Sequence, residues 1–247
     1  MTAALTVENL EVSFGGVNAL RAVSLSVDDG ERRVIIGPNG AGKTTLFNLI
    51  GGQISPSGGR VNLFGTEITG LSPWRRARLG LSRTFQISRL FQNLSVWDNL
   101  ILADGGPAGL SKSSFLSNGA NAAKRRQLAE LLEFWGLGET AAEPANSIAH
   151  GHQRLLEIAL AFATKPRVVL LDEPTSGLSG GDREMVVQRL AAIGRDVTVV
   201  LIDHDMDVVF SLADRITVLN YGEVLSEGDP AAVRNDPRVQ DIYLGRE

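Results

Sequence analysis

The hydrophobic positions of the chain follow strand-like patterns toward both of its ends. Residues 5–10 and 22–27 show partial alternation of apolar and polar side chains, and turn residues such as Gly15-Gly16 lie between them. Residues 33–36 form a compact apolar run that ends at Gly37, which is typical of a strand buried on both faces. The buried-strand pattern then returns three times toward the C-terminus, at 168–171, 197–202 and 215–219.

Helical spacing appears between these strands. A helix is expected from Lys43 to about Ile50, and apolar residues recur at i, i+3, i+4 and i+7 within 124–135. Further helices are predicted over 154–163 and 182–193. Residues 104–123 are rich in Gly, Ser, Ala and Asn, which predicts a mobile surface connection. The pattern therefore predicts an α/β core that is interrupted by a mostly helical insert near 89–164.

Composition narrows the class of protein. The chain has 247 residues, of which 43% are hydrophobic and 21% charged, so global disorder and coiled coil are excluded. The net charge of −4 argues against a nucleic-acid surface over the whole chain, and we expect no nucleic-acid partner. The absence of cysteine excludes disulfide scaffolds and Cys-ligated zinc. The apolar runs are far shorter than the roughly 20 residues of a membrane-spanning helix, so a cytoplasmic location is expected.

One segment matches a phosphate-binding pattern. The pattern G-x-x-x-x-G-K-[ST] is matched by Gly37-Pro38-Asn39-Gly40-Ala41-Gly42-Lys43-Thr44. Glycine lets backbone N–H groups approach phosphate oxygens, and the following helix directs its positive dipole end at the same anion. Lys43 is predicted to contact the terminal phosphates, Thr44 to offer a hydroxyl to Mg²⁺, and Thr45 to add a phosphate contact. The alternative is a chance match in a turn, but the strand–loop–helix setting favours nucleotide binding.

Two carboxylates follow the strand at 168–171. Asp172 is predicted to reach the sheet edge beside the phosphate loop and to hold Mg²⁺, directly or through water. Adjacent strand residues point to opposite faces, so Glu173 is expected to face the γ-phosphate and orient a water molecule. The alternative is a solvated acidic strand end, and the presence of a phosphate loop in the same chain argues against it.

These motifs, in this order and spacing, resemble the ABC transporter ATPase family over essentially the whole chain. The resemblance includes Leu171-Asp172-Glu173-Pro174-Thr175 and Leu201-Ile202-Asp203-His204. The segments Arg83-Thr84-Phe85-Gln86, Arg89-Leu90-Phe91 and Tyr243-Leu244-Gly245 are similar to the ATP-binding subunits of branched-chain amino acid importers.

The resemblance implies a fold. It is a P-loop NTPase (RecA-like) α/β core with an N-terminal antiparallel β subdomain, together spanning 1–88 and 165–247. A helical subdomain is expected to be inserted at 89–164.

The resemblance also implies roles for single residues. Phe14 would stack on adenine, although an isolated aromatic is usually a core residue. Gln86 would touch the water shell of Mg²⁺ and relay the nucleotide state to a membrane partner, although a lone glutamine is usually a surface residue. His204 would contact the γ-phosphate and position Glu173, so that Lys43, Glu173 and His204 form the catalytic set. A lone histidine at a strand end is otherwise structural.

The chain departs from the family pattern at one helix start. The motif that usually has the sequence Leu-Ser-Gly-Gly-Gln appears as Ile148-Ala149-His150-Gly151-His152. Gly151 is kept, while Ala149 lacks the serine hydroxyl and His150 replaces a glycine. His150 and His152 would add charge when protonated, or are simply solvated helix-start residues. Ser179 also stands where an aspartate is expected.

The resemblance implies partners as well. Two ATPase subunits, either two copies or one copy with a related ATPase, would pair head to tail. Each ATP would lie between the phosphate loop of one subunit and the Gly151 helix of the other. Integral membrane permeases would complete the transporter, and a periplasmic or extracellular binding protein would act indirectly. This chain is expected to lie in the cytoplasm, at the inner face of the cell membrane.

Several alternatives stay open at this point. The region of Phe91, Leu94, Val96 and Trp97 is either a docking surface for a permease helix or ordinary core. A lipopolysaccharide-type exporter and a urea or amide importer are alternative transporters. A soluble ABC ATPase of DNA repair or translation is the alternative outside transport. Such proteins usually carry two cassettes or a long coiled coil, whereas this chain has one phosphate loop and no heptad run.

Overall fold

The computed structural model describes residues 3–84, 90–105 and 118–243. The chain divides into two compact units, each of which is described by itself. We call the first the sheet unit; it comprises Met1–Arg83, Arg167–Glu173 and Ile193–Glu247. We call the second the helical unit; it comprises Thr84–Pro166 and Pro174–Ala192.

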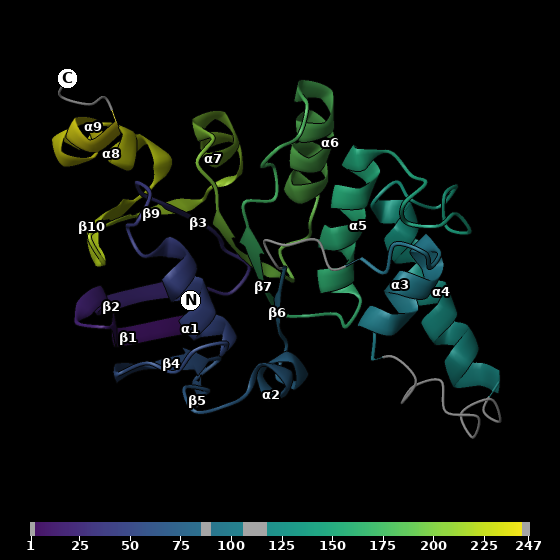
Figure 1. Cartoon of the computed structure of the whole chain (residues 1–247), viewed down its shortest axis with the longest axis horizontal. Helices are drawn as coiled ribbons and strands as arrows, with labels where there is room; N and C mark the ends of the chain where they lie inside the picture. The colour runs from purple at the N-terminus through teal and green to yellow at the C-terminus, as the bar shows by residue number, and fades with distance from the viewer. Residues whose placement is uncertain (1–2, 85–89, 106–117, 244–247) are drawn as a thin grey trace. The chain divides into compact units, whose positions relative to one another are not determined.

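A six-stranded sheet with the order β10-β9-β3-β8-β7-β6 organises the sheet unit (Figure 1). Its strands are β3 (Arg32–Ile36), β6 (Leu81–Arg83), β7 (Val168–Asp172), β8 (Thr198–Ile202), β9 (Arg215–Asn220) and β10 (Glu223–Gly228). All neighbouring pairs are parallel except β9 and β10. The carboxyl ends of β3, β6, β7 and β8 therefore lie at one edge, so the residues that follow these strands come together there.

A four-stranded antiparallel sheet, ordered β2-β1-β4-β5, confirms the expected N-terminal β subdomain. Its strands are β1 (Ala3–Phe14), β2 (Val17–Asp28), β4 (Gly58–Leu63) and β5 (Thr66–Glu67). The first two strands are 12 residues each and longer than the sequence predicted, because both continue to the Gly15-Gly16 turn. The apolar side chains of β1 alternate inward onto the core of the unit.

One helix joins the two sheets of this unit. The helices of the sheet unit are α1 (Lys43–Gly51), α2 (Pro73–Arg78), α7 (Met206–Leu212), α8 (Pro230–Arg234) and α9 (Pro237–Tyr243), and α1 is the one that joins the sheets. Helix α1 contacts β2 of one sheet and β6 and β7 of the other, and its buried Leu46, Phe47 and Ile50 belong to their shared core. Figure 1 shows α8 and α9 beside β10 at the C-terminal end. The start of α1 is thereby fixed against the sheet.

The helical unit is built around α5, which packs against α3, α4 and α6. Its helices are α3 (Val96–Ala103), α4 (Asn118–Phe134), α5 (His150–Phe162) and α6 (Gly180–Ala191). The fully buried Trp135 packs against the rings of Phe134 and Phe162. None of the described helices is long and apolar enough to cross a membrane.

Three helix predictions need correction at their ends. Helix α4 begins at Asn118, so the predicted mobile connection over 104–123 is wrong for 118–123, where alanines favour the helix. Helix α5 begins at His150 rather than at 154. Helix α6 extends over Gly180–Ala191, so both ends lie two residues before the predicted ones, and Ser179 caps its start.

Candidate nucleotide-binding site

The loop between β3 and α1 has a shape that only glycine permits at two positions. Gly37 has a φ of +154°, and a Cβ atom there would lie 2.2 Å from the carbonyl oxygen of Leu219. Gly42 has a φ of +102°, and its Cβ would lie 2.7 Å from Cδ2 of Leu20. Gly42 is also the N-cap of α1. Since glycine has no side chain, the cap leaves the first-turn N–H groups of α1 to a bound anion.

Lys43 begins α1, and its side chain turns back over this loop. Its Nζ atom donates to the carbonyl oxygen of Gly37 and, at 3.0 Å, to that of Pro38. Burial lowers the pKa of Lys43, while the negative charges of Glu173 and Asp172 act in the opposite direction. The fold therefore brings the Lys43 ammonium group within electrostatic reach of both carboxylates.

Asp172, the last residue of β7, has a fully buried side chain. Its Oδ2 atom accepts a hydrogen bond of 3.1 Å from Nη2 of Arg83, the last residue of β6. Burial lowers the pKa of Arg83, and the charge of Asp172 and this hydrogen bond act to raise it. The predicted magnesium carboxylate thus lies at the carboxyl edge of the sheet and is paired with a buried guanidinium group.

Glu173 leaves β7 in a backbone conformation that is rare for a residue with a side chain. Its φ is +47°, and its N–H donates to the carbonyl oxygen of Ile202 at 2.9 Å. Its Oε1 atom lies 3.6 Å from Nδ1 of His204. The side chains of Glu173 and His204 are 33% and 63% exposed, so both can reach a bound substrate. Positive φ angles of this kind gather at functional sites, where the surrounding fold holds them.

Asp203 shapes the turn that carries His204. It is buried, and its Oδ1 atom accepts hydrogen bonds from the backbone N–H groups of His204 and Asp205, at 2.8 and 3.0 Å. Sequence reasoning gave no role to Asp203 or Arg83, although both lie inside the quoted segments. The signal that could have found them is a charged residue directly at the end of a buried strand, because such a charge needs a partner.

The remaining predicted contacts of this unit are exposed or half-buried. Phe14 is the last residue of β1 and is 51% exposed, so it offers an accessible aromatic ring rather than a core residue. Thr44 and Thr45 are half-buried in the first turn of α1, while Asn39 and Gly40 are exposed in the loop. Gln86 lies outside the described residues, as do Leu244 and Gly245.

Close packing against α6 explains why a glycine lies at the start of α5 in the helical unit. A Cβ atom on the buried Gly151 would lie 2.3 Å from Oδ1 of Asp182 in α6. Ala149 has the extended backbone of an N-cap but offers no side-chain acceptor. Ser179 caps α6 by accepting from the N–H of Asp182. His150 is exposed and His152 half-buried.

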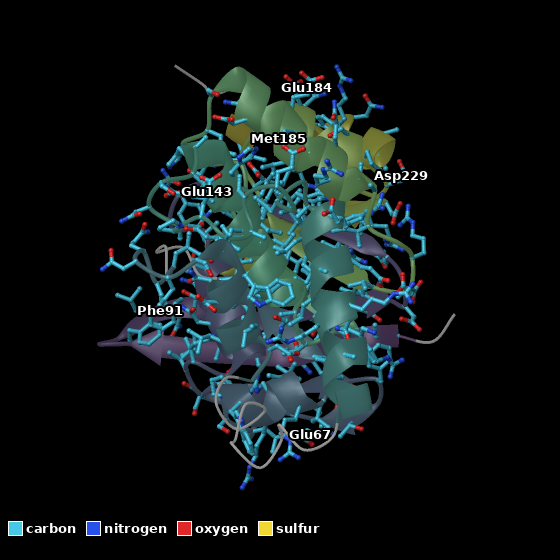
Figure 2. All side chains as sticks on the ribbon, turned by 90° about the vertical axis from the view of Figure 1, so that its right-hand side faces the viewer. Glu67, Phe91, Glu143, Glu184, Met185 and Asp229 are labelled. Carbon is cyan, nitrogen blue, oxygen red and sulfur yellow. The ribbon has the colours of Figure 1, made fainter. Side chains whose placement is uncertain are left out.

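The predicted docking segment divides into exposed and buried residues. Phe91 and Leu94 are 58% and 36% exposed, whereas Val96 is fully buried, so the core alternative holds for Val96. Figure 2 shows the Phe91 side chain pointing away from the ribbon. The buried Asn99 fixes this loop, because its side chain accepts from the N–H of Phe91 and donates to the carbonyl oxygens of Phe91 and Leu94.

Two families of known proteins match parts of this chain. The ABC transporter family matches residues 20–176, which is more than half of the chain. The chain belongs to the ABC transporter family. It is therefore a cassette that binds and hydrolyses ATP, as the phosphate loop predicted. A second family, the branched-chain amino acid ATP-binding cassette transporter, matches residues 223–247.

Curated relatives of this ABC cassette match it along nearly its whole length. It is 40% identical to the high-affinity branched-chain amino acid transport ATP-binding protein BraF of Pseudomonas aeruginosa, over 98% of this chain and 97% of BraF. It is 39% identical to LivG of Salmonella typhimurium and of Escherichia coli, proteins of the same description, with the same coverage. These relatives favour the branched-chain assignment over the exporter, urea and soluble alternatives.

Solved structures agree with the fold. An ABC transporter cassette in its ADP conformation superimposes with a TM-score of 0.86 at 30% identity, covering all of both chains. A nucleotide-free cassette gives a TM-score of 0.84 at 30% identity, covering 99% of this chain and 100% of the other. The expected fold class, a P-loop NTPase core with a β subdomain and added helices, is thereby confirmed.

Proposed function

We propose that this ABC cassette is the ATP-hydrolysing subunit of a branched-chain amino acid importer. It would work through separate membrane permeases at the inner face of the cell membrane. The observation that carries the proposal is the match of residues 223–247 to the branched-chain family, joined to about 40% identity with BraF and LivG. A binding protein outside the membrane would deliver the amino acid.

We propose that Mg²⁺ binds between the phosphates, Thr44 and Asp172, with Gln86 at its water shell. Among the residues that the structure describes, no group of three or more His, Cys, Asp or Glu side chains could hold a metal ion. Mg²⁺ does not need such a cage, since it usually takes one or two carboxylates together with substrate phosphates and waters. A buried carboxylate and a hydroxyl at one sheet edge fit that preference. The ion would offset charge on the phosphates.

The catalytic proposal rests on the cluster at the carboxyl ends of β3, β7 and β8. Glu173 orients the attacking water, Lys43 neutralises charge on the terminal phosphates, and His204 contacts the γ-phosphate and holds Glu173. Phe14 stacks on the adenine ring. Catalysis is then positioning plus charge stabilisation, which is how phosphoryl transfer is generally accelerated.

The transport cycle requires a second ATPase subunit in this proposal. The start of α5, with Gly151, would face the phosphates bound by the other subunit. Hydrolysis removes the γ-phosphate that joins the two subunits, and the pair opens. The exposed loop of Phe91 and Leu94 would bind an apolar face of a permease helix, and the hydrogen bonds of Asn99 to the backbone of Phe91 support the loop.

Uptake in cells tests the substrate class. In a strain that lacks this chain, uptake of radiolabelled leucine, isoleucine and valine should fall and return when the wild-type chain is restored. Arginine uptake serves as the control and should not change. Unchanged leucine uptake together with lost uptake of urea or an amide would contradict the proposal.

A further inference from the structure

Two buried side chains of opposite charge meet where β6 and β7 end. Nη2 of Arg83 lies 3.1 Å from Oδ2 of Asp172, and the two side chains are only 8% and 0% exposed. A buried carboxylate that loses its counter-charge strongly destabilises a protein. Arg83 therefore supplies positive charge to Asp172 in the folded chain.

The guanidinium group is fixed from two further sides. Its Nη1 atom donates to Oδ1 of Asn48 at 2.8 Å and to Oε1 of Gln53 at 3.1 Å. Its central carbon lies 5.6 Å from the centre of the Phe47 ring. Asn48 and Phe47 belong to α1, the helix that starts at the phosphate loop. The positive charge of Arg83 is thus held beside Asp172 by groups of α1 and Gln53 as well as by the carboxylate itself.

The fixed charge of Arg83 would repel a second cation that binds the same carboxylate. Two positive groups on one buried carboxylate repel each other far more strongly than two exposed groups, because the local dielectric response is weak. The phosphates of ATP bring negative charge that offsets the repulsion.

We infer that Arg83 is a permanent counter-ion of Asp172 and that its charge weakens the binding of Mg²⁺ at Asp172 before ATP has bound. Mg²⁺ then enters together with the ATP phosphates rather than ahead of them. Arg83 acts through Asp172 and is a positioning residue. The inference rests on the proposed role of Asp172 as a magnesium ligand.

The test measures how much Mg²⁺ strengthens nucleotide binding. The full chain is titrated with the fluorescent analogue N-methylanthraniloyl-ATP, once with saturating Mg²⁺ and once with EDTA, and the ratio of the two affinities is the magnesium enhancement. In Arg83→Met, binding in EDTA should weaken, because Asp172 then repels the phosphates. The enhancement should rise by about tenfold or more. Arg83→Lys keeps the charge and should stay within about threefold of the wild type.

Arg33→Met is the matched control. Arg33 is also buried, with a side chain that is 1% exposed, and it pairs with Glu31 at 2.6 Å and Glu227 at 3.0 Å, so its loss should lower thermal stability without changing the magnesium enhancement. If Arg83→Met weakens binding equally with and without Mg²⁺, its role is only structural and the inference is wrong. A smaller enhancement in Arg83→Met would also overturn it, since Arg83 would then help to hold the ion.

Asp172→Asn separates this inference from the proposed function. If Asp172→Asn keeps the wild-type enhancement, the proposed magnesium role of Asp172 fails. If Asp172→Asn abolishes it while Arg83→Met changes nothing, only the role of Arg83 fails. Should Arg83→Met not fold, the double variant with Asp172→Asn removes both charges and should recover folding. A double variant as unstable as the single one would contradict the counter-ion role.

Discussion

Nδ1 of His204 lies 3.6 Å from Oε1 of Glu173, at the carboxyl ends of the neighbouring strands β8 and β7. Three hydrogen bonds from backbone N–H groups fix the turns that carry the pair: the N–H of Glu173 donates to the carbonyl oxygen of Ile202, and Oδ1 of Asp203 accepts from the N–H groups of His204 and Asp205. The fold of the two strand ends therefore holds the two side chains close together, which is the arrangement that the proposed action on the γ-phosphate requires.

His204→Ala should slow ATP turnover far more than it weakens ATP binding. In the proposed mechanism the variant would lose both a phosphate contact and the group that holds Glu173, and removal of one preorganised donor commonly lowers kcat on the order of 100-fold. Steady-state hydrolysis should show the fall in kcat with little change in KM. Asp207→Asn, an exposed change three residues further along, is the control. Equal turnover in His204→Ala and the control would contradict the role of His204.

Ala149→Ser should stabilise the cassette. Ala149 already has the N-cap backbone of α5, with φ −57° and ψ 149°, so a serine hydroxyl can accept a first-turn N–H group. The expected gain in the free energy of unfolding is about 1 kcal/mol, measured by urea denaturation. Ser179→Ala, which removes the observed cap of α6, should lose a similar amount. Lower stability in Ala149→Ser would show that this helix start is not a simple cap.

Gly151→Ala should destabilise the helical unit irrespective of any role in ATP binding. The new Cβ would lie 2.3 Å from Oδ1 and 2.6 Å from Cγ of Asp182, so the whole Asp182 side chain must move. Overpacking of this kind costs about 1–3 kcal/mol, which thermal or urea denaturation can measure. Gly180→Ala meets no atom within 4 Å and is the control. Similar stability in both variants would disprove the packing role of Gly151.

Asp214 should make the cassette sensitive to acid. Burial alone would raise the pKa of Asp214. Its carboxylate accepts hydrogen bonds from the side chain of Arg195 and from the backbone N–H of Arg32, and these bonds together with the positive charges of the two arginines bring the pKa below the ordinary value of 3.8. A lowered pKa means that the stabilisation is present above about pH 4 and disappears as the pH falls through the folded-state value. Asp214→Asn should therefore show a shallower loss of urea stability between pH 5 and pH 2. An unchanged slope would contradict this.

The sequence predicted the features that local spacing determines. The phosphate loop, α1 and the strand that ends in Asp172 all depend on residues within a few positions of one another, so their pattern is visible in the chain. The starts of α4, α5 and α6 were missed by six, four and two residues, because capping and helix propensity determine a helix start more than apolar spacing does.

The contacts that tune the site are not local. Arg83 meets Asp172 across 89 positions of sequence, and only the strand order places β6 beside β7. The left-handed backbone of Glu173 has no signal in the residue type, since glutamate rarely adopts it. The contact of Gly151 with Asp182 likewise depends on how α5 and α6 pack.

The most direct test of the central claim is single-turnover hydrolysis by Glu173→Gln. Glutamine keeps the shape of the side chain but loses the charge that orients the water. ATP binding should remain near the wild-type affinity, ADP formation should fall by a factor on the order of 1000, and ATP should favour the dimeric form in light scattering. ADP formation at the wild-type rate would show that Glu173 does not orient the attacking water.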